Sequence, residues 1–228
     1  MSGKLHLGTG RNVKFEKGIH RARGADRIFS VSFPPIISCS KNLPCQDICY
    51  AKSLYKRRTC IRVAWLDNLE LYMSRPTEFW RELDERLERL NKPPKFFRFF
   101  VSGDFPRKEM VQETVEFAKR HPDTIFMAFT KRWIDGWIPP RKDLPDNLKI
   151  RLSAMPQIPT NPRKNLRSYP VAWMTGSGIY QEDRIPQGAI ECDGGCVTCT
   201  KCWTTDDDVV FHIHGSGRYV RKNKCLVT

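Results

Sequence analysis

Short apolar runs separated by helical or irregular stretches recur along the chain. Six of them have the apolar character of strands that are buried on both faces of a sheet. They lie at residues 27–37, 96–101, 124–129, 148–152, 171–174 and 209–213. Apolar residues at spacings of three and four predict helices over 62–73 and from Thr77 to about 91, and a further helix is predicted over 107–120. Strands alternating with helices or long connections are typical of parallel βα units.

This order of elements predicts an α/β fold, with an open or partial (β/α) barrel of about six parallel strands. We expect a basic, irregular arm over residues 1–27 and a single α/β domain over 28–228. Functional groups in such folds gather at the carboxyl ends of the strands. Here those ends carry Cys39, Asp104, Lys131, Ser153 and Thr175.

The chain has nine cysteines, and seven of them fall into two closely spaced groups. The first residues, Met1 to Arg11, are polar and basic, so they do not resemble a secretory signal. No run of about 18 apolar residues is present, and we expect no membrane span. We therefore expect a cytoplasmic protein, in which clustered thiols are more often metal ligands than disulfides.

The late cysteine group lies in a loop over 191–203, which reads ECDGGCVTCTKCW. Its members are Cys192, Cys196, Cys199 and Cys202. These short gaps let one loop fold four thiolates around a single centre, and two-residue gaps suit both zinc and iron–sulfur sites. Zinc sites usually divide their ligands between two distant pairs, so the compact run favours a [4Fe-4S] cluster, with zinc as the alternative.

The early cysteine group consists of Cys39, Cys45 and Cys49, directly after the first predicted strand. Three thiolates leave one coordination position open on a four-iron cluster or on a zinc ion, and a catalytic centre needs such a position. Cys60 is either a fourth ligand or a small core residue, and we interpret Cys225 as a core residue. A thiolate from the late group is a further candidate for the open coordination position. The sequence therefore allows either one shared centre or two separate ones.

The net charge of +14, from 39 Lys and Arg against 25 Asp and Glu, favours polyanions and nucleic acid first among them. The alternative is a solvated basic surface that keeps the protein soluble. Trp133, Trp137 and Trp173 would supply stacking in a nucleic-acid site, although aromatic residues in a chain of this length mostly fill the core.

The early group resembles the cluster motif of the radical S-adenosylmethionine enzymes, which are partial α/β barrels. Cys45, Cys49 and Tyr50 match the C-x3-C-aromatic part of that motif after the first strand, while Lys52 stands where the third cysteine would fall. Cys39 would then supply the third thiolate. The second strand ends in Ser102-Gly103-Asp104, which is similar to the family's cofactor-binding Gly-Gly-Glu-Pro segment.

This resemblance implies a four-iron cluster that binds S-adenosylmethionine, with Asp104 accepting the ammonium of the cofactor and a reductant as partner. It also implies that Thr130, Lys131, Ser153 and Thr175 face the substrate. The late group would hold an auxiliary cluster. The substrate and the oligomeric state do not follow from the sequence.

Four motifs in order are more closely similar to the phage-encoded gene-product-88-like proteins. They are Cys49-Tyr50-Ala51, Ser102-Gly103-Asp104-Phe105, Thr130-Lys131 and the run from Cys196 to Trp203. The resemblance implies a viral or mobile-element origin and a site of action in the host cytoplasm. Three functions stay open: a radical-type iron–sulfur enzyme, a non-catalytic protein with structural metal that binds nucleic acid or a host protein, and a degenerate enzyme that keeps the cluster as a scaffold or redox sensor.

Overall fold

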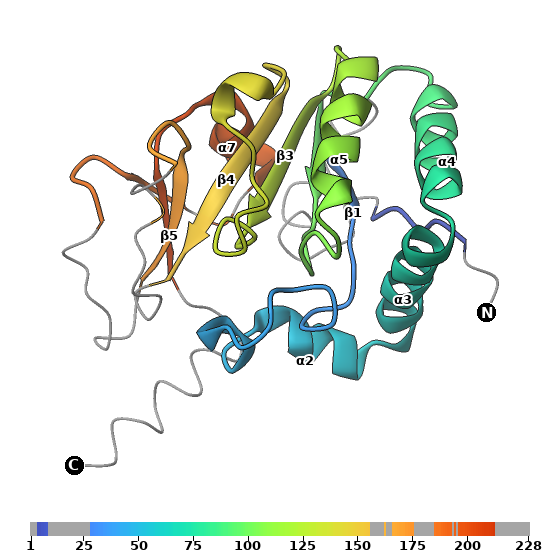
Figure 1. Ribbon diagram of the computed structural model, residues 1–228, viewed down its shortest axis with the longest axis horizontal. Helices are drawn as coiled ribbons and strands as arrows, with labels where there is room; N and C mark the ends of the chain where they lie inside the picture. Colours follow the sequence, from blue (N-terminus) through green and yellow to red (C-terminus); the bar gives the residue numbers. More distant parts are fainter. Residues whose placement is uncertain are drawn as a thin grey trace.

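The centre of the molecule is one sheet of seven parallel strands (Figure 1). The computed structural model describes residues 4–8, 28–155, 162, 166–175, 185–192, 194 and 196–212, so Cys225 lies outside the described residues. The strands are β1 (Ile28–Val31), β2 (Phe96–Phe99), β3 (Ile125–Thr130), β4 (Leu148–Ala154), β5 (Val171–Thr175), β6 (Ile190–Glu191) and β7 (Val209–His212). Their order, β1-β2-β3-β4-β5-β7-β6, follows the chain except at the last pair.

This topology confirms the predicted α/β class with parallel strands, and the open sheet is compatible with a partial barrel. All six predicted strands are present. The seventh, β6, was not predicted, because two residues give no periodic signal. Two strands also end earlier than expected: β1 stops before Pro34, and β2 stops where Phe100 takes a φ of 60°.

Four helices follow β1 or β2; the apolar residues of the last three cover one face of the sheet, and the first lies at the carboxyl ends of the strands (Figure 1). They are α2 (Tyr50–Arg57), α3 (Thr59–Ser74), α4 (Pro76–Glu88) and α5 (Glu109–Arg120). The alternation of each strand sends Phe97, Phe99 and Phe126 to this face, where they pack with Leu83 and Phe117. Helix α2 was not predicted. Helix α4 begins at Pro76, a position that tolerates proline because its N–H would have no partner there.

The opposite face of the sheet is covered by the segment that carries the late cysteine group. Two single-turn helices form there, α6 (Cys196–Cys199) and α7 (Lys201–Thr204). Trp203 packs against Ile28, Phe96 and Met127, and its indole N–H donates to the Phe97 carbonyl at 3.1 Å. The molecule therefore has a layer on each side of the sheet, with cysteines in the smaller one.

Residues 4–8, which belong to the predicted arm, are docked on the domain. Gly8 forms an antiparallel bridge with Ser30 at the outer edge of β1. The backbone N–H of His6 donates to Asn68 Oδ1 at 2.7 Å, and the amide of Asn68 donates back to the His6 carbonyl at 2.9 Å. This segment is thus tied to α3, and it covers an otherwise open sheet edge.

Candidate functional site

The early cysteine group lies in a tight loop beyond the carboxyl end of β1. Ile36 takes a φ of 72°, and both the hydroxyl and the N–H of Ser38 donate to the Pro34 carbonyl. A single 3-10 turn, Pro44–Gln46, contains Cys45, and Cys49 is the N-cap of α2. The Tyr50 hydroxyl donates to the Val101 carbonyl, which fixes the start of α2 to the end of β2.

Gly103 allows this loop to approach the end of β2 closely. Its φ is +83°, and a Cβ at this position would lie 2.4 Å from Ser38 Oγ and 2.9 Å from the Phe33 carbonyl oxygen. No side chain fits there. The backbone N–H of Phe33 donates to the Ser102 carbonyl at 3.1 Å, so the two strand ends are joined directly.

Asp104 is buried where β2 and β3 end side by side. Its Oδ1 accepts hydrogen bonds from the Thr130 hydroxyl at 2.7 Å and the Phe105 N–H at 2.9 Å, and its Oδ2 accepts one from the Lys131 N–H at 2.8 Å. Burial raises the pKa of this carboxyl, and these hydrogen bonds partly offset the rise. A carboxylate has about four acceptor positions, so Asp104 retains about one for a ligand.

The Arg132 guanidinium holds the cysteine loop against the end of β3. It donates to the Ser38 carbonyl at 2.8 Å, to Ser40 Oγ at 3.1 Å and to the Phe105 carbonyl at 2.7 Å. It also pairs with Asp135 at 2.8 Å. The loop is therefore positioned from both sides of Cys39, by a residue that the sequence analysis did not predict to belong to the site. The only signal was a basic residue following the Thr130-Lys131 strand end.

The three early thiols have the chemistry of a site for a thiophilic metal. Burial, followed by the nearby Asp104 carboxylate, raises the pKa of the Cys39 thiol to about 12. Burial also raises the pKa of Cys45, while the Lys131 ammonium opposes this. Cys39 interacts electrostatically with Cys45 and Cys49, so the loop gathers all three. The thiolate forms of these buried cysteines repel one another, so the thiols ionise readily only beside a cation such as a bound metal.

A single metal ion and a four-iron cluster require different separations of their thiolate ligands. Among the described residues, no three His, Cys, Asp or Glu side chains are arranged to hold one metal ion. Around a tetrahedral zinc, with Zn–S bonds of about 2.3 Å, the sulfurs are about 3.8 Å apart. A cube of four irons and four sulfides is wider, and it requires ligands that surround it at a greater separation.

A buried hydroxyl next to Asp104 has no hydrogen-bond partner in the part of the chain that the structure describes. Ser102 Oγ is buried and forms no hydrogen bond to the described part of the protein. An unsatisfied buried polar group costs about 1–3 kcal/mol, and a polar ligand atom would remove that cost. The predicted cofactor-binding segment Ser102-Gly103-Asp104 thus combines an unpartnered hydroxyl with a carboxylate that retains acceptor capacity.

The four residues expected to face the substrate do not all lie at the same place in the structure. Lys131 is half-buried and lies near Cys45. Thr130 is buried, and its hydroxyl is bound to Asp104. Ser153 and Thr175 are also buried, and the pleat places Ser153 on the opposite face of the sheet from Thr130 and Thr175. Of the four, Lys131 is the one that the structure brings to the early cysteines.

The late cysteine group is seated on the sheet by Arg151 of β4. This fully buried guanidinium donates to four backbone carbonyls of the cysteine segment: Lys201 at 3.4 Å, Cys202 at 3.1 Å, Thr205 and Asp207. Burial raises the pKa of the Cys202 thiol to about 11, although the positive charge of Arg151 stabilises the thiolate and lowers this pKa. Cys196 and Cys192 lie within electrostatic reach of Cys202, and Cys199 follows on the single-turn helix α6.

Arg98 of β2 faces this late group. Its guanidinium lies 5.0 Å from the Phe129 ring, is buried, and attracts the Cys202 thiolate, yet its Nε has no hydrogen-bond partner in the described part of the protein. A centre held by thiolates carries negative charge, and such a centre would supply the partner that Arg98 lacks.

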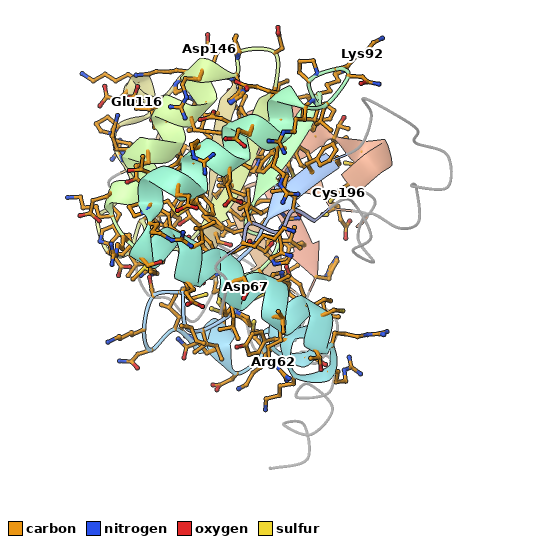
Figure 2. All side chains as sticks on the ribbon, turned by 90° about the vertical axis from the view of Figure 1, so that its right-hand side faces the viewer. Arg62, Asp67, Lys92, Glu116, Asp146 and Cys196 are labelled. Carbon is orange, nitrogen blue, oxygen red and sulfur yellow. The ribbon has the colours of Figure 1, made fainter. Side chains whose placement is uncertain are left out.

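The two cysteine groups occupy different parts of the sheet. The early group follows the carboxyl end of β1. The late group packs on the other layer, beside Ile28 and Phe96, which are the first residues of β1 and β2. Figure 2 shows Cys196 beside the sheet, well above the end of the molecule at which Arg62 lies. This placement favours two separate centres over one that pools ligands from both groups.

Comparison with known proteins identifies one family. The family described as gene product 88 matches residues 7–205, a range that includes both cysteine groups. No curated protein and no solved structure shows significant similarity to this chain. Within the described residues, no helix is long and apolar enough to cross a membrane.

Proposed function

The chain belongs to the gene product 88 family, and we propose that it is an iron–sulfur enzyme of the radical S-adenosylmethionine type. In this proposal Cys39, Cys45 and Cys49 hold a four-iron cluster, and Ser102 and Asp104 bind the cofactor. Once reduced by an external one-electron donor, such a cluster would supply one electron for reductive cleavage of S-adenosylmethionine. The observation that carries the proposal is the buried Ser102 hydroxyl beside Asp104, which has no hydrogen-bond partner among the described residues and lies at the strand end next to the cysteine loop.

Three described side chains have different roles at this site. Arg132 holds the backbone on both sides of Cys39. Asp104 fixes the ends of β2 and β3 through Thr130 and Lys131, and its remaining acceptor position suits an ammonium group. The Lys131 ammonium offsets the negative charge that thiolates bring to this buried loop.

The late group provides ligands for a second centre, which differs from the first in having no open coordination position. Cys192, Cys196, Cys199 and Cys202 provide four thiols, so a cluster held by all of them has no open position. Arg98 and Arg151 attract the Cys202 thiolate, and they would stabilise an anionic centre in the same way. We propose an auxiliary [4Fe-4S] cluster here, with a zinc ion as the competing occupant.

Metal analysis of protein purified without oxygen tests both centres. We would measure iron, sulfide and zinc together with the absorption spectrum of the wild type and of Cys39→Ala, Cys196→Ala and Cys60→Ala variants. Cys60 is exposed at the start of α3 and serves as the matched control. We expect about eight irons in the wild type and in Cys60→Ala, and about four in each of the other variants.

Two further outcomes bear on the proposal. Reductive cleavage of S-adenosylmethionine that is lost in Cys39→Ala but kept in Cys60→Ala supports the enzyme. Zinc without iron contradicts it and favours a protein with structural metal.

A further inference from the structure

Helix α2 and the start of α3 carry a group of positive side chains with no acidic residue among them in the sequence. We call it the α2–α3 basic face, and it consists of Lys52, Lys56, Arg57, Arg58 and Arg62. The sequence has no Asp or Glu between Asp47 and Asp67. Three of the five, Lys56, Arg57 and Arg58, are exposed, and the other two are half-exposed. None of the five takes part in an ion pair with the described residues.

The basic residues of α4 and α5 are arranged differently. Arg89 pairs with Glu85 at 3.0 Å, Lys119 pairs with Glu116 at 3.0 Å, and Arg81 pairs with Glu85. On those helices carboxylates three or four residues away neutralise the surface cations. The unpaired charge of the α2–α3 basic face is therefore a local feature and not a general result of the net charge of +14.

Two aromatic rings lie among these cations. The rings of Tyr55 and Trp65 are nearly parallel, with an interplanar angle of 10° and centroids 6.3 Å apart, and both residues are half-exposed. Aromatic faces next to cations offer stacking surfaces for bases as well as contacts for phosphates. Neighbouring apolar side chains on α3 are also exposed, including Val63 at 45%.

The basic face adjoins the early cysteine loop. Cys49 is the N-cap of α2, and Tyr50, the first residue of the helix, is anchored to the Val101 carbonyl. Figure 1 shows α2 at the carboxyl ends of the strands, and Figure 2 shows Arg62 at the same end of the molecule, far from Lys92 and Asp146. A strand lying along α2 would therefore pass the candidate centre.

We propose that the α2–α3 basic face binds nucleic acid, with its cations on the phosphate backbone. This inference goes beyond the iron–sulfur centre and does not require it, because the contacts come from side chains that are not metal ligands. Several unpaired cations along two consecutive helices fit a repeating anion, and release of counterions makes such binding strongly dependent on salt.

The test compares two triple variants that each remove three positive charges. The first is Lys56→Gln, Arg57→Gln, Arg58→Gln on the basic face. The control is Lys119→Gln, Arg81→Gln, Arg89→Gln, which has the same composition and also alters exposed side chains. A fluorescent 20-nucleotide single strand of mixed sequence would be titrated at several salt concentrations by anisotropy, with thermal melts of each variant to confirm folding.

We expect the basic-face variant to bind about tenfold or more weakly at 100 mM salt, with a salt slope smaller by about two, since each single-strand phosphate contact contributes about 0.7. The control variant should bind within about twofold of the wild type. A charge-preserving variant, Lys56→Arg, Arg57→Lys, Arg58→Lys, should retain binding. Equal loss in both triple variants, or wild-type binding to anionic vesicles but not to the oligonucleotide, would overturn the proposal.

The apoprotein separates this inference from the proposed enzyme. Oligonucleotide binding that persists in Cys39→Ala, with the same loss in the basic-face variant, supports the surface even if no iron is found. Binding that disappears in Cys39→Ala while the protein stays folded contradicts a surface independent of the centre.

Discussion

The guanidinium of Arg132 and the backbone carbonyl of Ser38 are joined by a hydrogen bond of 2.8 Å, although the two residues are 94 positions apart. This contact, with those to Ser40 and Phe105, ties the loop of the early cysteines to the end of β3. The geometry of the candidate centre therefore depends on a residue that contributes no ligand.

Replacing Arg132 by lysine should loosen the loop while keeping the charge. An ammonium cannot reproduce the guanidinium fork, so buried carbonyls lose their donors. We expect the free energy of unfolding to fall by about 2–4 kcal/mol and the iron content of the early centre to fall with it. Urea unfolding and metal analysis measure these, with Arg89→Lys on the surface as the control. Unchanged stability and iron content would contradict this role.

Gly103 is expected to tolerate no side chain. Gly103→Ala combines a left-handed backbone with contacts of 2.4 Å to Ser38 Oγ and 2.9 Å to the Phe33 carbonyl oxygen. Gly136 has a similar φ of +69° with nothing within 4 Å, so Gly136→Ala isolates the backbone cost of about 1–2 kcal/mol. Thermal melts should show Gly103→Ala to be the more destabilised by about 2 kcal/mol or more. Equal losses would mean that the close approach does not exist.

The Ser102 hydroxyl should reduce the stability of the free protein and support cofactor binding. Ser102→Ala removes a buried group that has no partner among the described residues, so the apoprotein should gain about 1 kcal/mol. The same variant should bind S-adenosylmethionine more weakly, as measured by calorimetry on the reconstituted protein. Loss of apoprotein stability would show that the hydroxyl has a partner within the fold. Ser153→Ala, at the end of β4, is the comparison.

The Cys39 thiol should react slowly with alkylating agents in the metal-free protein. Its pKa of about 12 leaves about one thiol in ten thousand ionised at pH 8, and the thiolate is the reactive form. Because the pKa is raised, the reaction should keep accelerating with pH up to that value. Iodoacetamide labelling followed by peptide mass spectrometry should show Cys60 modified before Cys39, since Cys60 is exposed. Equally fast labelling of Cys39 at pH 8 would mean that the loop is open.

The sequence predicted the elements whose signal is local. Strands such as β3 and β4 are buried apolar runs, and Asp104 could be placed at a strand end from the run before it. Helix α2 was missed because its segment, Tyr50–Arg57, is only eight residues long and buries one of them, Ala51, so it is too short for a clear periodic signal. The roles of Arg132 and Arg151 could not be predicted, because their partners are distant in the chain and become neighbours only when the sheet forms.

Arg151 should determine whether the late cysteine group keeps its position. Arg151→Met keeps the length and much of the volume of the side chain but removes the donors to the carbonyls of Lys201, Cys202, Thr205 and Asp207. We expect a loss of about 3 kcal/mol or more in the free energy of unfolding. Metal should be lost from the late group while the early group retains its own.

The control for Arg151 lies two residues earlier on the same strand and face. Lys149→Met removes the partially exposed pairing with Asp206 at 3.3 Å, which should cost about 1 kcal/mol or less. Urea unfolding and iron analysis of both variants separate the two effects. Full iron content in Arg151→Met would contradict this role. It would mean that the late cysteines position their own loop, and that Arg151 turns toward them as a result of metal binding and is not needed for it.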